Sequence, residues 1–159
     1  MAERNTPLDK EPVEVLLAED NPGDVRLTRD ALRGGKIRMN LNVVGDGEEA
    51  LAFLRQEGQF SQALRPALVL LDLNMPKKDG YEVLQEIRKD PELECIPVVV
   101  FTSSEAKDDI LRCYRYRANA YVSKPTYVEQ FTNAVRLIEE FWFRVAQLPP
   151  HGGGRKLSV

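Results

Sequence analysis

Five short apolar runs alternate with stretches of helical periodicity along this chain, and this alternation limits the fold more than any other feature. Short apolar runs bounded by turn signals are typical of strands buried on both faces of a parallel sheet. The expected strands are residues 13–18, 41–44, 67–71, 97–101 and 118–122. Strands that alternate with helices predict a sheet covered on both faces and joined by right-handed crossovers. We therefore expect an α/β fold, one doubly wound domain with five parallel strands.

The segments between the runs carry helix signals. Asn21 and Pro22 predict a cap and a first-turn proline, and Asp46 with Glu49 forms a capping-box pattern. For this reason we interpret Asp46 as a helix cap and not as a site residue. The hydroxyls of residues 102–104 can cap the fourth helix, and Thr126 with Glu129 can cap the last. The expected helices are about 22–33, 47–57, 80–89, 105–115 and 126–146.

Length and charge narrow the class of protein. A chain of 159 residues suits one domain, here placed at residues 12–147, with disordered ends at 1–11 and 148–159. A net charge of −3 argues against nucleic acid or an anionic membrane as partner. No apolar run is long enough to span a bilayer. A disulfide between Cys95 and Cys113 stays open, but reduced thiols in a cytoplasmic protein are the preferred interpretation.

Polar side chains follow every expected strand. These are Glu19 and Asp20, Asp46, Asp72, Thr102, and Lys124. The carboxyl ends of parallel strands lie along one edge of the sheet, where ligands bind in open α/β folds. Carboxylates that converge there need a cation, and oxygen-only ligands suit a hard ion such as Mg²⁺. A lysine and a hydroxyl beside it suit a phosphoryl group, with Asp72 as its acceptor.

Each of these residues also has an ordinary structural interpretation. Alone, Asp72 could cap a turn, Glu19 could favour a helix N-terminus, Thr102 could be a cap and Lys124 a solvated charge. Their joint occurrence at the ends of four strands favours a functional site.

The chain resembles the receiver domain of bacterial response regulators over about residues 13–146. The matching stretches are LLAEDNPGDVRLTRDAL, GDGEEAL, LVLLDLNMPKKDGYEVL, IPVVVFTSS and ANAYVSKP. The stretches EDNPGDVRLTRDAL and NMPKKDG and the closing IEEFW are most similar to single-domain regulators paired with phytochrome-type sensor kinases. The resemblance implies a five-stranded sheet of order 2-1-3-4-5.

The resemblance also implies roles for single residues. Asp72 would accept the phosphoryl group from a kinase phosphohistidine. Asp20 would bind Mg²⁺ directly, Glu19 through water, and Asn74 through its backbone carbonyl. Thr102 and Lys124 would bind phosphoryl oxygens. Tyr121 would be the switch aromatic that turns inward as Thr102 moves, and the bond between Lys124 and Pro125 would be cis.

The end of the last helix is apolar nearly all round because of Phe141, Trp142 and Phe143. These aromatics could fold back over the edge of the domain. We favour a homodimer interface, because a contiguous exposed aromatic patch is costly in a monomer.

The resulting prediction is a single-domain phosphoacceptor switch of a two-component pathway that signals by protein contact. One alternative is a metal-dependent phosphatase, which would commonly need a second acid where Asn74 stands. The other is a pseudo-receiver that binds partners without being phosphorylated, for which the full set of site residues would be unnecessary.

Overall fold

A computed structural model describes residues 11–150 and shows a five-stranded parallel sheet of order β2-β1-β3-β4-β5. The expected fold class and strand order are confirmed. The disorder expected at residues 1–10 and 151–159 lies outside the described residues. The strands are β1 (Val13–Ala18), β2 (Met39–Val44), β3 (Leu68–Leu71), β4 (Val98–Thr102) and β5 (Ala120–Ser123).

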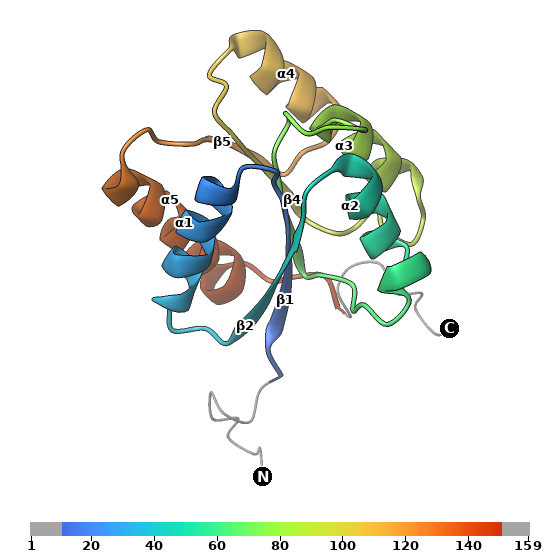
Figure 1. Ribbon diagram of the computed structural model, residues 1–159, viewed down its shortest axis with the longest axis horizontal. Coiled ribbons are helices and arrows are strands. Elements are labelled where there is room, and N and C mark those ends of the chain that lie inside the picture. Colours follow the sequence, from blue (N-terminus) through green and yellow to red (C-terminus); the bar gives the residue numbers. More distant parts are fainter. Residues whose placement is uncertain (1–10, 151–159) are drawn as a thin grey trace.

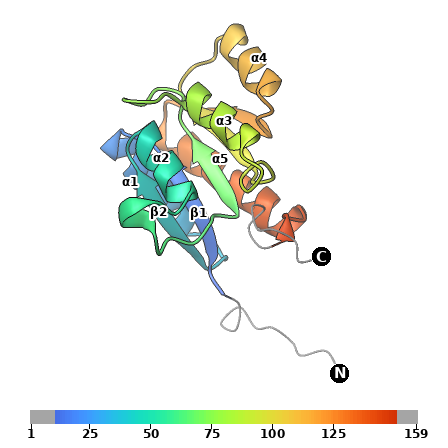
Figure 2. The same cartoon turned by 90° about the vertical axis from the view of Figure 1, so that its right-hand side faces the viewer.

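Helices cover both faces of the sheet (Figure 1, Figure 2). They are α1 (Pro22–Arg33), α2 (Gly47–Leu54), α3 (Gly80–Lys89), α4 (Lys107–Arg115) and α5 (Val128–Glu140), with a 3₁₀ turn at Gly58–Phe60 and a π-helical turn at Phe141–Val145. One apolar core joins the sheet to α2, α3 and α4, and the other joins it to α1 and α5. The described residues contain no helix with the length and apolar character needed to cross a membrane.

The central strands explain why the sheet lies in the middle. All four residues of β3 and all five of β4 are buried, as expected for uninterrupted apolar runs covered on both faces.

Helix α1 begins as expected, because the Asn21 side chain accepts a hydrogen bond from the Asp24 N–H. Asp46 caps α2 through the Glu49 N–H, which confirms its structural interpretation.

Several expected boundaries are wrong. β2 begins at Met39 because its ladder with β1 starts at Val13. α2 ends at Leu54, before Gln56 takes a positive φ of 59°. The expected caps of α4 and α5 are absent, and these helices begin at Lys107 and Val128 without a side-chain cap.

One buried arginine, Arg88, connects helix α3 to the segments that precede β4 and β5. Arg88, at the end of α3, donates from Nη1 to the carbonyls of Glu94 and Ile96 at 2.8 and 2.9 Å. Its Nε donates to the Arg117 carbonyl at 3.0 Å and its Nη2 to Asn119 Oδ1 at 2.8 Å. One guanidinium therefore joins α3 to the segments that lead into β4 and β5.

The end of α5 divides its aromatic residues between two environments. In the π-helical turn the Ala146 N–H donates to the Phe141 carbonyl five residues earlier. Trp142 and Phe143 are partly buried against the core under α1 and α5. Leu137, Phe141 and Val145 remain 50–65% exposed and follow one another at four-residue spacing. Part of the aromatic end therefore folds back on the domain, and part forms an exposed apolar stripe.

Both cysteines are free, which removes the disulfide alternative. Cys95 is exposed, whereas Cys113 lies on the buried face of α4, and burial raises the pKa of its thiol to about 11. A rise of about two pH units above an ordinary thiol lowers the thiolate fraction at pH 8 by about 100-fold. We expect iodoacetamide at pH 8 to modify Cys95 readily and Cys113 at least 100-fold more slowly, as followed by peptide mass mapping. The Cys95→Ser variant should show no fast reaction, and equal labelling of both thiols in native protein would contradict this burial.

Candidate phosphoacceptor and metal site

The predicted site residues meet at the carboxyl edge of the central strands. β1, β3 and β4 are neighbours in register, with Ala18 beside Leu71 and Leu71 beside Val100. Glu19 and Asp72 directly follow β1 and β3, and Thr102 is the last residue of β4. Lys124 directly follows β5, whose Ser123 pairs with Thr102. The strand order thus gathers residues that lie up to 105 positions apart in the sequence.

Asp72 lies at the centre of the site and is buried. Its Oδ1 accepts hydrogen bonds from the Thr102 hydroxyl at 2.8 Å and from the Asn74 N–H at 3.3 Å. Its Oδ2 accepts from Lys124 Nζ at 3.1 Å. Both carboxylate oxygens therefore face groups that can stabilise additional negative charge.

Lys124 is enclosed by three carboxylates. Besides Asp72, its ammonium donates to Glu19 Oε1 and, at 2.9 Å, to Asp24 Oδ2. The Lys124 side chain is only 7% exposed, so these ion pairs are shielded from water. Burial alone would lower the pKa of Lys124, but the hydrogen bonds to Glu19 and Asp24 and the charge of Asp72 outweigh it and raise the pKa.

Glu19 shows the electrostatic cost of gathering these acids. Burial, aided by the charge of Asp72, raises the pKa of Glu19 to about 7 although Lys124 and the Asn21 N–H stabilise its ionised form. The cluster gathers four acidic side chains, those of Glu19, Asp20, Asp24 and Asp72, but only one ammonium, that of Lys124, which is an excess of acidic over basic groups. This excess would favour an added cation.

The donor set fits a hard divalent ion. Carboxylate oxygens of Glu19, Asp20 and Asp72 lie within 4.8 Å of one another, and Asp20 is exposed while the other two are buried. An oxygen-only set with one open side is typical of Mg²⁺ or Mn²⁺ sites. Asn74 lies beside the cluster through its N–H bond to Asp72, and the metal-binding role of its carbonyl stays a prediction.

Two glycines allow the loops to approach one another. A Cβ atom on Gly80 would lie 2.3 Å from the Asp72 carbonyl oxygen, and one on Gly47 would lie 2.1 Å from the Lys78 carbonyl oxygen. Both contacts are with backbone, which cannot move aside cheaply. Gly80 therefore allows α3 to begin directly against the strand end that carries Asp72.

Tyr121 is joined to the loop that follows β4. Its hydroxyl donates to the Ser104 carbonyl at 2.9 Å, and the Ser123 hydroxyl donates to the same oxygen at 3.1 Å. The Ser104 hydroxyl donates to Asp109 Oδ2 at 2.6 Å, and the Tyr81 hydroxyl donates to the other oxygen of Asp109. The loop is thus bound directly to α4 and β5, and Asp109 connects it to Tyr81 of α3. The inward turn of Tyr121 stays a prediction.

Two features differ from the sequence-based picture. The described residues contain no cis peptide bond, so the prediction of a cis bond before Pro125 is wrong. The trans form is the favoured isomer even before proline, and only the family resemblance suggested otherwise. Asp24 was missed as a site residue. Its place in the first turn of the helix that follows Asp20 was the signal available in the sequence.

This fold and site define a receiver of two-component signalling. Residues 15–136 match the response regulator receiver domain, and the chain belongs to that family. It is therefore a response regulator receiver.

Among similar proteins, response regulator Rcp1 of Synechocystis sp. (strain PCC 6803) is 43% identical over 138 residues, which cover 87% of this chain and 94% of Rcp1. The structure of the phosphorylated cyanobacterial phytochrome response regulator RcpA is 47% identical with a TM-score of 0.85, covering 87% of this chain and 99% of RcpA. The Mn²⁺-bound form of Rcp1 has a TM-score of 0.83 at 43% identity, with coverages of 87% and 99%.

Proposed function

We propose that Asp72 accepts a phosphoryl group from the phosphohistidine of a sensor histidine kinase. The observation that carries the proposal is the buried Asp72 carboxylate, with Thr102 on one oxygen and Lys124 on the other. In the transfer, a bond forms between an Asp72 oxygen and phosphorus, the bond from phosphorus to the imidazole nitrogen breaks, and the imidazole leaves. Catalysis then rests on positioning and charge neutralisation.

Several groups around Asp72 would together neutralise the negative charge of the phosphoryl group. Mg²⁺ would supply positive charge at the phosphoryl oxygens, held by Asp20 and Asp72 directly, by the Asn74 carbonyl, and by Glu19 through water. Lys124 would leave the Asp72 oxygen to neutralise a phosphoryl oxygen, while Asp24 and Glu19 keep its ammonium near the site. The Thr102 hydroxyl would donate to another phosphoryl oxygen. The same site would support self-phosphorylation by small phosphodonors and autodephosphorylation.

The conformational change that a protein partner would recognise would start at Thr102. Movement of its hydroxyl toward the phosphoryl group would draw the loop after β4 and open space for Tyr121 to turn inward. The Tyr121 hydroxyl bond to the Ser104 carbonyl supports this coupling, because the aromatic ring and the loop already share a contact. The surface of α4, β5 and α5 would then change shape for a protein partner.

The partner kinase is proposed to be of the phytochrome type, and the protein to act in the cytoplasm without binding nucleic acid. Support comes from RcpA, described as a cyanobacterial phytochrome response regulator, which shares 47% identity over most of both chains. The net charge of −3 also disfavours a nucleic-acid partner.

The decisive measurement is intact mass after incubation with acetyl phosphate and Mg²⁺. We expect one phosphoryl adduct on the wild-type chain and none on Asp72→Asn or in EDTA, because the acceptor oxygen and the cation are both needed. Asp46→Asn is a matched control, since Asp46 caps α2 outside the site, and it should retain the adduct. A folded wild-type protein that gains no adduct would favour the non-phosphorylated pseudo-receiver.

We also propose a homodimer through the end of α5. Phe141 would be central, together with the exposed Leu137 and Val145, whereas Trp142 and Phe143 would contribute only the parts that their own core leaves uncovered. An exposed apolar stripe of this kind is costly in a monomer and favours association.

Sedimentation with and without beryllofluoride, a phosphoryl mimic, tests this dimer. We expect the mimic to tighten association, and Leu137→Glu with Phe141→Glu to give a monomer in both conditions because each carboxylate would be buried in the interface. A control with the same charge change is Gln130→Glu with Asn133→Glu, at exposed polar positions of α5. The same monomeric mass with and without the mimic would contradict the proposal.

A further inference from the structure

The outer edge of β2 is an unprotected strand edge. Strand order places β2 at one end of the sheet, and among residues 11–150 its only strand partner is β1. Edge strands are commonly protected by charged residues, proline or bulges. The six residues of β2 read MNLNVV and contain none of these, and they pair continuously with β1. The edge is therefore free of the usual devices that prevent another strand from pairing.

The hydrogen-bond pattern shows which backbone groups point outward. The carbonyls of Arg38 and Val44 accept hydrogen bonds from β1 residues Val13 and Glu19. The N–H and C=O of one residue lie on the same side of a strand, and this side alternates along the chain. Even-numbered residues of β2 thus face β1, and the backbone groups of Met39, Leu41 and Val43 face the open edge.

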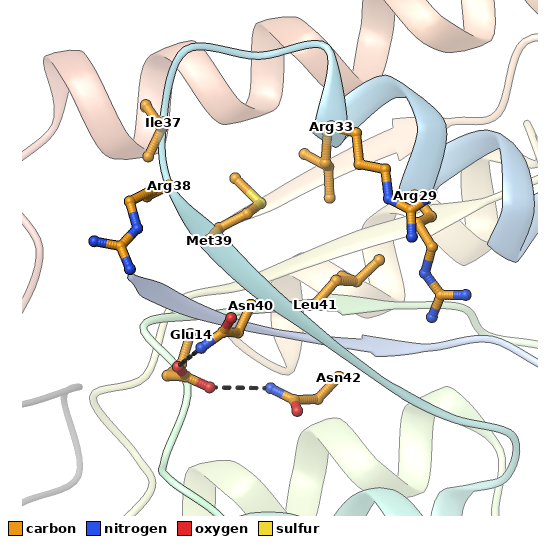
Figure 3. A pocket seen from close by; sticks show the side chains of 10 residues that line it. Glu14, Arg29, Arg33, Ile37, Arg38, Met39, Asn40, Leu41 and Asn42 are labelled. Carbon is orange, nitrogen blue, oxygen red and sulfur yellow. Dashed lines mark hydrogen bonds between the residues drawn. The ribbon is translucent and has the colours of Figure 1, made fainter. Parts of the chain in front are cut away.

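A groove of about 580 Å³ follows this edge (Figure 3). Its apolar floor consists of Leu32 from α1 with Met39 and Leu41 from β2. Leu32 is buried, whereas Met39 and Leu41 are half-buried and retain exposed apolar surface. Side chains at alternate positions of an added strand could contact this floor.

Arginines surround the groove. Arg29 and Arg33 lie four residues apart on α1 and therefore on the same helix face, and Arg38 directly precedes β2 (Figure 3). Within the described part of the chain, Arg29 and Arg33 have no ion-pair partner. The acid of the groove, Glu14, accepts hydrogen bonds from Asn40 and Asn42 at 2.7 and 3.2 Å. Its charge is thus engaged away from the two α1 arginines.

We propose that the β2 edge binds an extended acidic segment of a partner protein as an added strand. Main-chain hydrogen bonds to Met39, Leu41 and Val43 would hold the segment, its acidic side chains would pair with Arg29 and Arg33, and its apolar side chains would contact the floor. A second copy of this chain fits less well, because it would bring its own arginines to the same edge. This surface lies outside the phosphoacceptor site and does not depend on phosphorylation.

The test uses a fluorescein-labelled ten-residue peptide of alternating glutamate and valine, with a lysine and valine peptide for comparison. Fluorescence anisotropy should show saturable binding of the acidic peptide only, weakened by added salt. In ¹⁵N-labelled protein the amide signals that shift should centre on Met39, Leu41 and Val43. Absence of binding at low salt, or shifts centred elsewhere, would overturn the proposal.

Two pairs of variants separate charge from backbone pairing. The double variant Arg29→Glu with Arg33→Glu should weaken binding about tenfold or more. The control variant, Arg26→Glu with Lys107→Glu, makes the same charge change at exposed positions outside the groove and should not weaken binding. Leu41→Pro should bind about tenfold more weakly than Leu41→Ala, because both lose the leucine but only proline loses the outward N–H. Equal binding by the two Leu41 variants would overturn the added-strand geometry even if the arginines matter.

Other occupants give distinct outcomes. Self-association that Leu41→Pro abolishes would replace the partner with a second copy of the chain. Hydrogen-exchange protection of the Met39, Leu41 and Val43 amides before any peptide is added would place residues 1–10 or 151–159 on the edge. A single-stranded oligonucleotide that binds more tightly than the acidic peptide would assign the arginines to nucleic acid. Each of these results would overturn the proposal.

Discussion

Replacement of Lys124 by methionine is expected to tighten Mg²⁺ binding by roughly 30-fold. The Lys124 ammonium lies among the carboxylates of Glu19, Asp24 and Asp72, two of which belong to the candidate metal site. A unit charge about 4 Å from a divalent ion repels it by about 2 kcal/mol even at the dielectric constant of water, and 1.4 kcal/mol is a factor of ten. Methionine retains most of the aliphatic side chain and removes only the competing charge.

Isothermal titration calorimetry at pH 8 is the appropriate measurement, because this pH lies above the raised pKa of Glu19, about 7. Lys107→Met, at an exposed position that begins α4, makes the same charge change and should alter Mg²⁺ affinity by less than about twofold. Without metal, Lys124→Met should also lower the midpoint of thermal unfolding, and Mg²⁺ should restore much of the loss. Unchanged or weaker Mg²⁺ affinity would show that Lys124 does not compete for the acid cluster.

Replacement of Arg88 by methionine is expected to lower the free energy of unfolding by about 3–5 kcal/mol. Its guanidinium makes four hydrogen bonds at 2.8–3.0 Å, three of them to main-chain carbonyls of Glu94, Ile96 and Arg117. Methionine has a similar length but cannot donate, so these carbonyls would lose their charged donor, and the Ile96 carbonyl is buried. The fourth acceptor, Asn119, also holds the Val98 N–H at the start of β4.

Urea unfolding of Arg88→Met and Arg115→Met compares a buried with an exposed arginine. Arg115, in the last turn of α4, is exposed, and its replacement should change stability by no more than about 0.5 kcal/mol. A loss below about 1 kcal/mol for Arg88→Met would indicate that water or the relaxed loops satisfy the freed carbonyls.

The sequence was sufficient to predict the sheet and most of the site because both depend on simple spacing. Uninterrupted apolar runs predicted β3 and β4, and a polar residue after each run predicted which side chains meet. Asp72, Thr102 and Lys124 are confirmed as neighbours by direct hydrogen bonds, and Glu19 and Asp20 lie beside Asp72. Their proposed chemical roles stay predictions.

The predictions failed where a side chain binds a tertiary partner and does not play the role that its local sequence pattern indicates. The Ser104 hydroxyl, one of those expected to cap the fourth helix, binds the Asp109 side chain instead, whereas the Thr102 hydroxyl binds Asp72 as the predicted site requires. Asp24 has the sequence position of an ordinary acid in the first turn of a helix. It belongs to the site only because Lys124, which follows β5, donates a hydrogen bond to its carboxylate. No local pattern contains a partner that is 100 positions away.

The Ser104 carbonyl determines how sharply such a protein can respond. It accepts hydrogen bonds from both the Tyr121 and Ser123 hydroxyls, while the Ser104 side chain holds Asp109. A displacement large enough to release this residue therefore breaks three bonds together, and small displacements break none. The loop should accordingly occupy two discrete positions. A partial signal would then change the fraction of molecules in the switched position, and not the position of the loop in each molecule.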